Sequence, residues 1–195
     1  MNDQEKYLKK LKFKGKIIKT DRWEYKYPKK DIIKREVVLL KILKKLLSIF
    51  KKNEIDYIID ASSLLAISRG QKLAEFTDID IAIKSENTNL KKLIKIIKKQ
   101  DTYSYKSFIF HKKKHFLFKK GSFLQCVLTS KCNSYIREPV NIEFYTENKL
   151  NKNYHRFVSP NLISIIPEKY RNQTKIKKYS NITLDIPKDT DGYLI

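Results

Sequence analysis

The amino-acid sequence predicts a mixed α/β domain of the α+β class, in which one mixed β-sheet is flanked by helices. Two stretches, 31–52 and 88–100, carry apolar residues at the three-and-four spacing of amphipathic helices. The segments 55–60 and 78–83 lie between them and are apolar runs of strand length. Several strand-like segments follow the second helix. Helices and strands that alternate and then give way to strands favour a single mixed sheet.

The first predicted helix covers residues 31–52. Asp31 is expected to cap its N-terminus, and Asn53 is expected to end it. The residues expected on its apolar face are Ile33, Val37, Leu40, Leu43 or Lys44, Leu47 and Phe50. Because these positions fall on one side of a helix, we expect the helix to pack against the sheet.

A strand, a short helix and a second strand are expected next. Residues 55–60 (IDYIID) are typical of a buried strand, and 61–70 (ASSLLAISRG) of a short helix that stops at Gly70. A loop over 71–77 leads to residues 78–83 (DIDIAI), where acidic and apolar side chains alternate as in a strand.

Four strand-like segments follow the helix at 88–100. They are SFIFH (107–111), HFLFKK (115–120), SFLQCVLT (122–129) and VNIEFY (140–145). The tail, 150–195, contains three of the five prolines and is expected to be irregular. We therefore expect an N-terminal arm over residues 1–30 and a single domain over residues 31–195.

The net charge of +22 comes from 43 Lys and Arg residues against 21 Asp and Glu residues. One interpretation is an anionic partner such as nucleic acid. The other is codon composition, because the excess is almost entirely lysine, and AT-rich codons supply Lys, Ile and Asn. Both interpretations stay open, and under either one a basic surface attracts substrates that carry phosphate.

The composition also limits the class of protein. A hydrophobic content of 41% is too high for a disordered chain. Cys126 and Cys132 have neither metal-site nor disulfide spacing, so we expect free thiols in a reducing compartment. The N-terminus lacks an apolar signal region, and lysines interrupt the longest apolar stretch, so we expect a cytoplasmic protein without a membrane span.

Asp78 and Asp80 are the strongest candidates for catalytic residues. Side chains two apart on a strand point to the same face, which leaves Ile79, Ile81 and Ile83 for the buried face. The two Cα atoms would then stand about 7 Å apart, close enough for the carboxylates to share a hard cation. Since Mg²⁺ combines carboxylates with substrate phosphate oxygens, the pair predicts a phosphoryl-transfer site.

Other residues could complete this site. If Ile142 and Phe144 face the core, Glu143 faces outward and could be a third metal ligand or a general base. Further candidates for phosphate binding are Ser62, Ser63, Arg69 and Lys72. Taken singly, each feature has an ordinary explanation: acids on an exposed strand, serines that cap a helix, a solvated glutamate. Their order along the chain favours the catalytic interpretation.

The segment IDYIIDASSLLAISRGQKLAEFTDIDIAI, residues 55–83, resembles the core motif of the nucleotidyltransferase fold superfamily. Within it, the chain looks most like the LicD/fukutin family of phosphotransferases, because DASSLLAISR matches a family stretch in which Arg69 falls on the family arginine. The match is good over about residues 35–85 and loose over 180–195. The chain departs from the family pattern at Ser62 and Ala66, which replace glycines, and at Thr77, which replaces an aspartate.

This resemblance implies a nucleotidyltransferase-like catalytic domain over residues 31–195. Asp78, Asp80 and Glu143 would bind Mg²⁺ or Mn²⁺, and a phospho-alcohol group such as phosphocholine or ribitol phosphate would move from a CDP-linked donor to a glycan hydroxyl. Two alternatives stay open. The chain could transfer an NMP group to a protein or tRNA, or it could be a catalytically inactive, basic homologue that binds nucleic acid, the less favoured partner.

Overall fold

The computed structural model describes residues 29–76, 78–84, 89–100, 105–110, 120–131, 137–147, 152–159 and 162–194. The expected arm over residues 1–30 therefore lies almost entirely outside the described residues, as does the greater part of segment 115–120. Within the described ranges, no helix is long and apolar enough to cross a bilayer.

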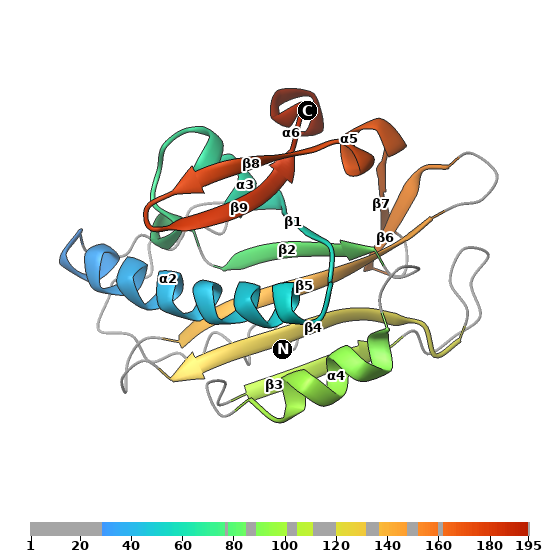
Figure 1. Cartoon of the computed structure of the whole chain (residues 1–195), viewed down its shortest axis with the longest axis horizontal. Coiled ribbons are helices and arrows are strands. Elements are labelled where there is room, and N and C mark those ends of the chain that lie inside the picture. The colour runs from blue at the N-terminus through green and yellow to red at the C-terminus, as the bar shows by residue number, and fades with distance from the viewer. Residues whose placement is uncertain are drawn as a thin grey trace.

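A mixed β-sheet forms the centre of the molecule (Figure 1), which confirms the expected fold class. The order of its main strands is β1 (Tyr57–Ile59), β2 (Ile79–Lys84), β5 (Arg137–Glu147), β4 (Phe123–Lys131) and β3 (Tyr105–Phe110). Strands β2 and β5 pair in parallel, whereas β1–β2, β5–β4 and β4–β3 are antiparallel pairs.

Two further pairs of strands extend this arrangement. Strand β6 (Tyr154–Ser159) continues from the end of β5 and pairs with β7 (Leu162–Ile166). Strands β8 (Thr174–Tyr179) and β9 (Ile182–Pro187) form a separate hairpin, and β9 lies against β1. In the described residues, helices α5 (Glu168–Asn172) and α6 (Thr190–Leu194) flank this hairpin along the chain.

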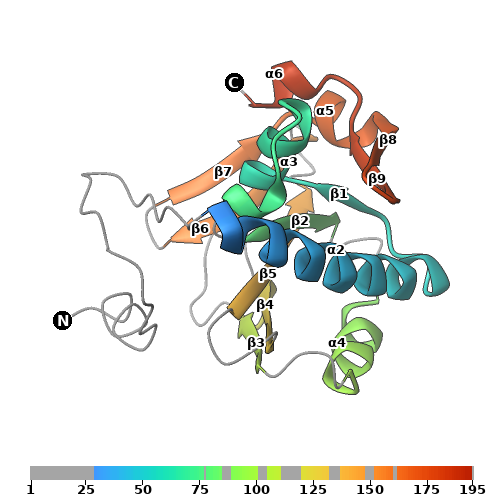
Figure 2. The ribbon, with the colours of Figure 1, turned by 90° about the vertical axis from the view of Figure 1, so that its left-hand side faces the viewer.

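The helices α2 (Lys29–Lys52) and α4 (Leu90–Lys98) cover one face of the sheet, as Figures 1 and 2 show. Leu39, Ile42, Leu43, Leu46 and Phe50 of α2 join the core that Ile79, Ile81 and Ile83 form on that face of β2. The expected apolar face of this helix is wrong at Ile33 and Val37, which are 59% and 64% exposed. The short helix α3 (Ala61–Ser68) connects β1 to the 3₁₀ helix η1 (Leu73–Glu75), which precedes β2. The alternation of the three isoleucines thus predicted the buried face of β2 correctly.

Several boundaries differ from those predicted. Helix α2 begins at Lys29, so Asp31 lies in its first turn and does not cap it. Asn53 does end the helix, and its side-chain amide donates to the carbonyl of Ile49 at 2.8 Å. Helix α4 is capped by Asn89, whose side-chain oxygen accepts from the Lys92 amide at 3.0 Å. The segment expected as a loop before β2 contains η1.

The prediction of an irregular tail is wrong. Strands β6, β7, β8 and β9 all lie in that region. Strand β9 shows a pattern that does predict a strand. In ITLDIP, Ile182, Leu184 and Ile186 are buried, whereas the residues between them are less buried. Of the prolines that suggested irregular structure, Pro167 precedes α5 and Pro187 ends β9, where neither interrupts a ladder, and Pro160 lies outside the described residues.

Candidate active site

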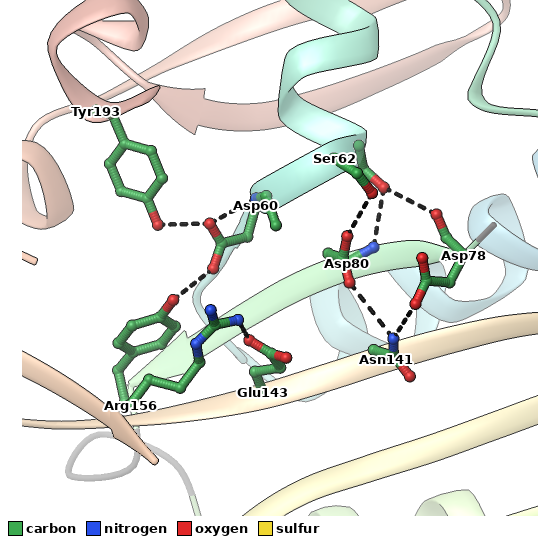
Figure 3. A network of polar contacts seen from close by, with 11 residues as sticks. Asp60, Ser62, Asp78, Asp80, Asn141, Glu143, Arg156 and Tyr193 are labelled. Carbon is green, nitrogen blue, oxygen red and sulfur yellow. Dashed lines mark hydrogen bonds and ion pairs between the residues drawn. The ribbon is translucent and has the colours of Figure 1, made fainter. Parts of the chain in front are cut away.

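Asp78 and Asp80 come together at the start of β2. Asp80 is 7% exposed and stands beside Asn141 in the parallel β2–β5 pair. The side-chain amide of Asn141 donates to Asp78 Oδ2 and to Asp80 Oδ1, the latter at 3.4 Å (Figure 3). One amide group is therefore within reach of both carboxylates, which places the two acids on the same side of the sheet.

The first turn of α3 is attached directly to these acids. Ser62 Oγ donates to Asp80 Oδ2 at 2.8 Å. Ser63 Oγ accepts from the Asp80 backbone amide at 2.9 Å and donates to the Asp78 carbonyl at 3.4 Å. Ser63 is fully buried, so its hydroxyl positions the start of β2 and is not open to a phosphate. Ser62 is only partly buried and stays at the edge of the site.

Asp60 is a site residue that the sequence analysis missed. It caps α3, with its Oδ1 accepting from the Ala61 amide at 2.7 Å. Oδ1 also accepts from the hydroxyl of Tyr193, and Oδ2 from that of Tyr145, both at 2.7 Å. The signal was present, since aspartate directly before Ala-Ser-Ser is a preferred N-cap residue. Its two tyrosine partners, however, come from distant parts of the chain.

Glu143 does not join the aspartate pair. In the β2–β5 register it stands beside Ala82, one step further along the same face than Asp80. Its carboxylate forms an ion pair with Arg156, whose guanidinium lies 5.8 Å from the Tyr145 ring centroid. Among the described residues, no group of three or more His, Cys, Asp or Glu side chains is arranged to hold a metal. In the described structure, the side chain that contacts both aspartate carboxylates is that of Asn141.

Arg69 and Lys72 lie away from the start of α3. Arg69 follows the last residue of the helix and Lys72 precedes η1, and both are exposed. The backbone of Arg69 is displaced from Ser62 by about 10 Å along the helix axis, given a rise of about 1.5 Å per residue. The described structure therefore groups Ser62 with the carboxylates and places the Arg69 backbone at the opposite end of α3.

The carboxylates of Asp78 and Asp80 repel each other, and this repulsion would favour a bound cation. The pKa of Asp80 is raised from its ordinary value of 3.8 to about 7, with burial as the largest cause and the negative charge of Asp78 as the second. Hydrogen bonds from Ser62 and Asn141 oppose this rise, and the charge of Asp60 adds a smaller contribution to it. A divalent cation between Asp78 and Asp80 would remove their repulsion. Mg²⁺ fits, because it commonly takes one or two protein carboxylates and completes its shell with water and phosphate oxygens.

Comparisons with known proteins do not show a family for this chain. No protein-family model and no curated protein matches the sequence. The chain is similar to a solved structure of lincosamide antibiotic adenylyltransferase LnuA with lincomycin bound, at 14% sequence identity and a TM-score of 0.49, over 80% of this chain and 84% of that chain. A likeness this low carries no argument about function. The resemblance to the LicD/fukutin family receives no support from these comparisons.

Proposed function

We propose that the protein is a metal-dependent nucleotidyltransferase that transfers an NMP group from a nucleoside triphosphate to an acceptor hydroxyl. The observation that carries this proposal is that Ser62, in the first turn of α3, bonds to the Asp80 carboxylate while the Asn141 amide links that carboxylate to Asp78. A pair of carboxylates beside a helix start combines a site for a hard cation with backbone amides suited to phosphate.

Each residue has a proposed role in the reaction. Asp78 and Asp80 would hold Mg²⁺ or Mn²⁺, which neutralises charge on the donor phosphates when bound. Ser62 and the free amides of the α3 start would orient a phosphate oxygen. Asn141 holds the two carboxylates in one orientation through its amide. Arg69 and Lys72 would attract the anionic donor to the site from the exposed surface.

Glu143 is proposed as the general base. It lies on the same face as Asp80, one step along β5, and the ion pair with Arg156 fixes the position of its carboxylate. The acceptor oxygen would attack the α-phosphorus as its proton passes to Glu143. The bond from the α-phosphorus to the bridging oxygen would break, and pyrophosphate would leave with the electron pair. The products are the NMP-modified acceptor and pyrophosphate.

A donor panel tests the function. The purified protein would be incubated with Mn²⁺ or Mg²⁺, each α-labelled NTP, and either tRNA or protein as acceptor. CDP-choline and CDP-ribitol would be tested in parallel, because the same centre could also accept the phospho-alcohol donors. We expect metal-dependent transfer of label from an NTP, reduced by at least about 100-fold in Asp80→Asn, since loss of a direct ligand exceeds the 10–100-fold typical of outer-shell changes.

Asp56→Asn is the matched control. Asp56 is exposed ahead of β1, so the same chemical change there should leave transfer unaltered. If only the CDP-linked donors support transfer, the proposed NMP transfer is wrong and the protein transfers a phospho-alcohol group. Equal activity in Asp80→Asn and wild type, or RNA binding that is independent of metal and of Asp80, would contradict the catalytic proposal.

A further inference from the structure

The carboxylate of Asp60 lies where the C-terminal part of the chain meets the first turn of α3. It is 4% exposed and accepts hydrogen bonds from Tyr193 of α6, from Tyr145 of β5 and from the Ala61 amide. Tyr193 is 133 positions away in sequence. A buried carboxylate with three donors is held in one orientation, because rotating it would leave buried donors without a partner.

Both tyrosine hydroxyls are protonated, and can donate, near neutral pH. Burial raises the pKa of each hydroxyl above its ordinary value, and the charge of Asp60 raises it further. The buried side chain of Arg171 lies near the same group and donates to the Ala82 carbonyl at 3.4 Å. Burial of the guanidinium lowers the pKa of Arg171, and the charges of the surrounding groups, Tyr193 and Asp60 first among them, oppose this effect.

The backbone at the start of α3 needs such support. Ala61 adopts φ +44°, in the left-handed region that residues with a Cβ avoid. A conformation of this kind persists only where surrounding contacts determine it. The Asp60 carboxylate holds the Ala61 amide, and the Asp60 backbone amide donates to the Asp80 carbonyl at 3.0 Å. The next residue, Ser62, contacts the Asp80 carboxylate.

We propose that Tyr193 is a positioning residue: its hydroxyl fixes Asp60, and Asp60 in turn fixes the Ala61–Ser62 turn against the carboxylate of Asp80. The C-terminal helix α6 thereby completes the active site without contacting the substrate. Figure 3 shows this chain of contacts running from Tyr193 through Asp60 toward Ser62 and Asp80. The proposal rests on the proposed nucleotidyl transfer at Asp78 and Asp80, because it assigns Tyr193 a role in that reaction.

The test compares Tyr193→Phe with Tyr170→Phe. The Tyr170 ring of α5 packs edge-on against that of Tyr193, with centroids 6.3 Å apart, so the control removes the hydroxyl of a neighbouring tyrosine. In Tyr193→Phe we expect kcat to fall by about 10-fold or more, as for other outer-shell partners, with KM for the nucleotide changed by less than about twofold. Tyr170→Phe should keep both constants within about twofold of wild type.

Hydrogen exchange supplies a readout that does not depend on activity. Loss of the Tyr193 hydroxyl should speed exchange of the Ala61 amide by about 10-fold, as expected for loss of one hydrogen bond to a charged group, while amides of α2 are unchanged. Tyr145→Phe removes the other tyrosine donor and should produce the same pattern.

The outcomes separate the two proposals. An active wild type with an equally active Tyr193→Phe, or with unchanged Ala61 exchange, overturns the positioning role alone. A rise in exchange that extends equally to α2 also overturns it, because the hydroxyl would then act on global stability only. A wild-type protein that transfers no nucleotide from any donor overturns the proposed function and this role together.

Discussion

Asn141 of β5 stands directly beside Asp80 of β2 in the parallel strand pair, and its side-chain amide donates to that carboxylate at 3.4 Å. The same amide also donates to Asp78. Asn141 thus occupies the position on the neighbouring strand from which a third carboxylate could reach a shared cation. Its neutral amide relieves some of the repulsion between the two acids.

Replacing Asn141 with Asp should change stability and metal binding in opposite directions. Without metal, a third carboxylate adds like-charge repulsion and removes a donor, so we expect the free energy of unfolding to fall by about 1–3 kcal/mol. With a third ligand, Mn²⁺ should bind about 10-fold more tightly. Urea denaturation with a chelator present and Mn²⁺ titration would measure the two effects. Weaker Mn²⁺ binding in this variant would argue against a cation at the pair.

The stability of the metal-free protein should depend on pH through Asp80. Its pKa is about 7 in the folded state, against an ordinary value of 3.8, so the folded protein binds this proton more tightly than the unfolded chain does. The stabilising effect of protonation is complete below about pH 4, and it is lost as pH rises through about 7. We expect the free energy of unfolding to fall across this window by up to about 1.4 kcal/mol per pH unit from this group.

Asp80→Asn should remove this contribution, leaving a flatter pH profile and a metal-free protein that is more stable than wild type near pH 8. Urea denaturation at several pH values, with a chelator, would compare the two. If the free energy of unfolding has the same pH dependence in wild type and variant, the folded protein does not bind the Asp80 proton more tightly than the unfolded chain does.

A buried arginine should support the segment that leads into the site. Arg35 of α2 is fully buried, and its Nη1 donates to the carbonyls of Ala74 at 2.7 Å and Phe76 at 2.6 Å. Arg35→Met would leave these carbonyls without that donor, and we expect a loss of about 2–4 kcal/mol in the free energy of unfolding. Lys34→Met at the exposed neighbouring position is the control and should change stability by less than about 0.5 kcal/mol. Similar losses in both variants would mean that the hydrogen bonds of Arg35 contribute little.

The thiol of Cys126 should be unreactive in the folded protein. It is fully buried on β4, and burial raises its pKa to about 12. Because the thiolate is the reactive form, labelling with a disulfide reagent at pH 8 should be slower than for an unfolded chain by at least about 100-fold. A Cys132→Ser background isolates Cys126, and urea should restore fast labelling. Fast labelling without urea would show that β4 opens readily.

Parts of the site could be predicted because their pattern is local. The alternation in DIDIAI placed Ile79, Ile81 and Ile83 in the core, and the same period put Asp78 and Asp80 on one face. Alternation also placed Asn141 and Glu143 together on a face of their strand. It could not decide which of them stands beside Asp80, because that depends on the register between β2 and β5.

The sequence by itself determined the α+β class, helix α2, the buried face of β2 and the pairing of its two acids, since each follows from the period of a helix or a strand. Tertiary structure alone decided that Asn141 joins the acids, that Glu143 pairs with Arg156, and that Tyr193 holds Asp60. These contacts join residues up to 133 positions apart. The period of a helix or strand cannot predict contacts between residues so far apart in sequence. They form when the C-terminal segment packs against α3 and when β5 pairs with β2.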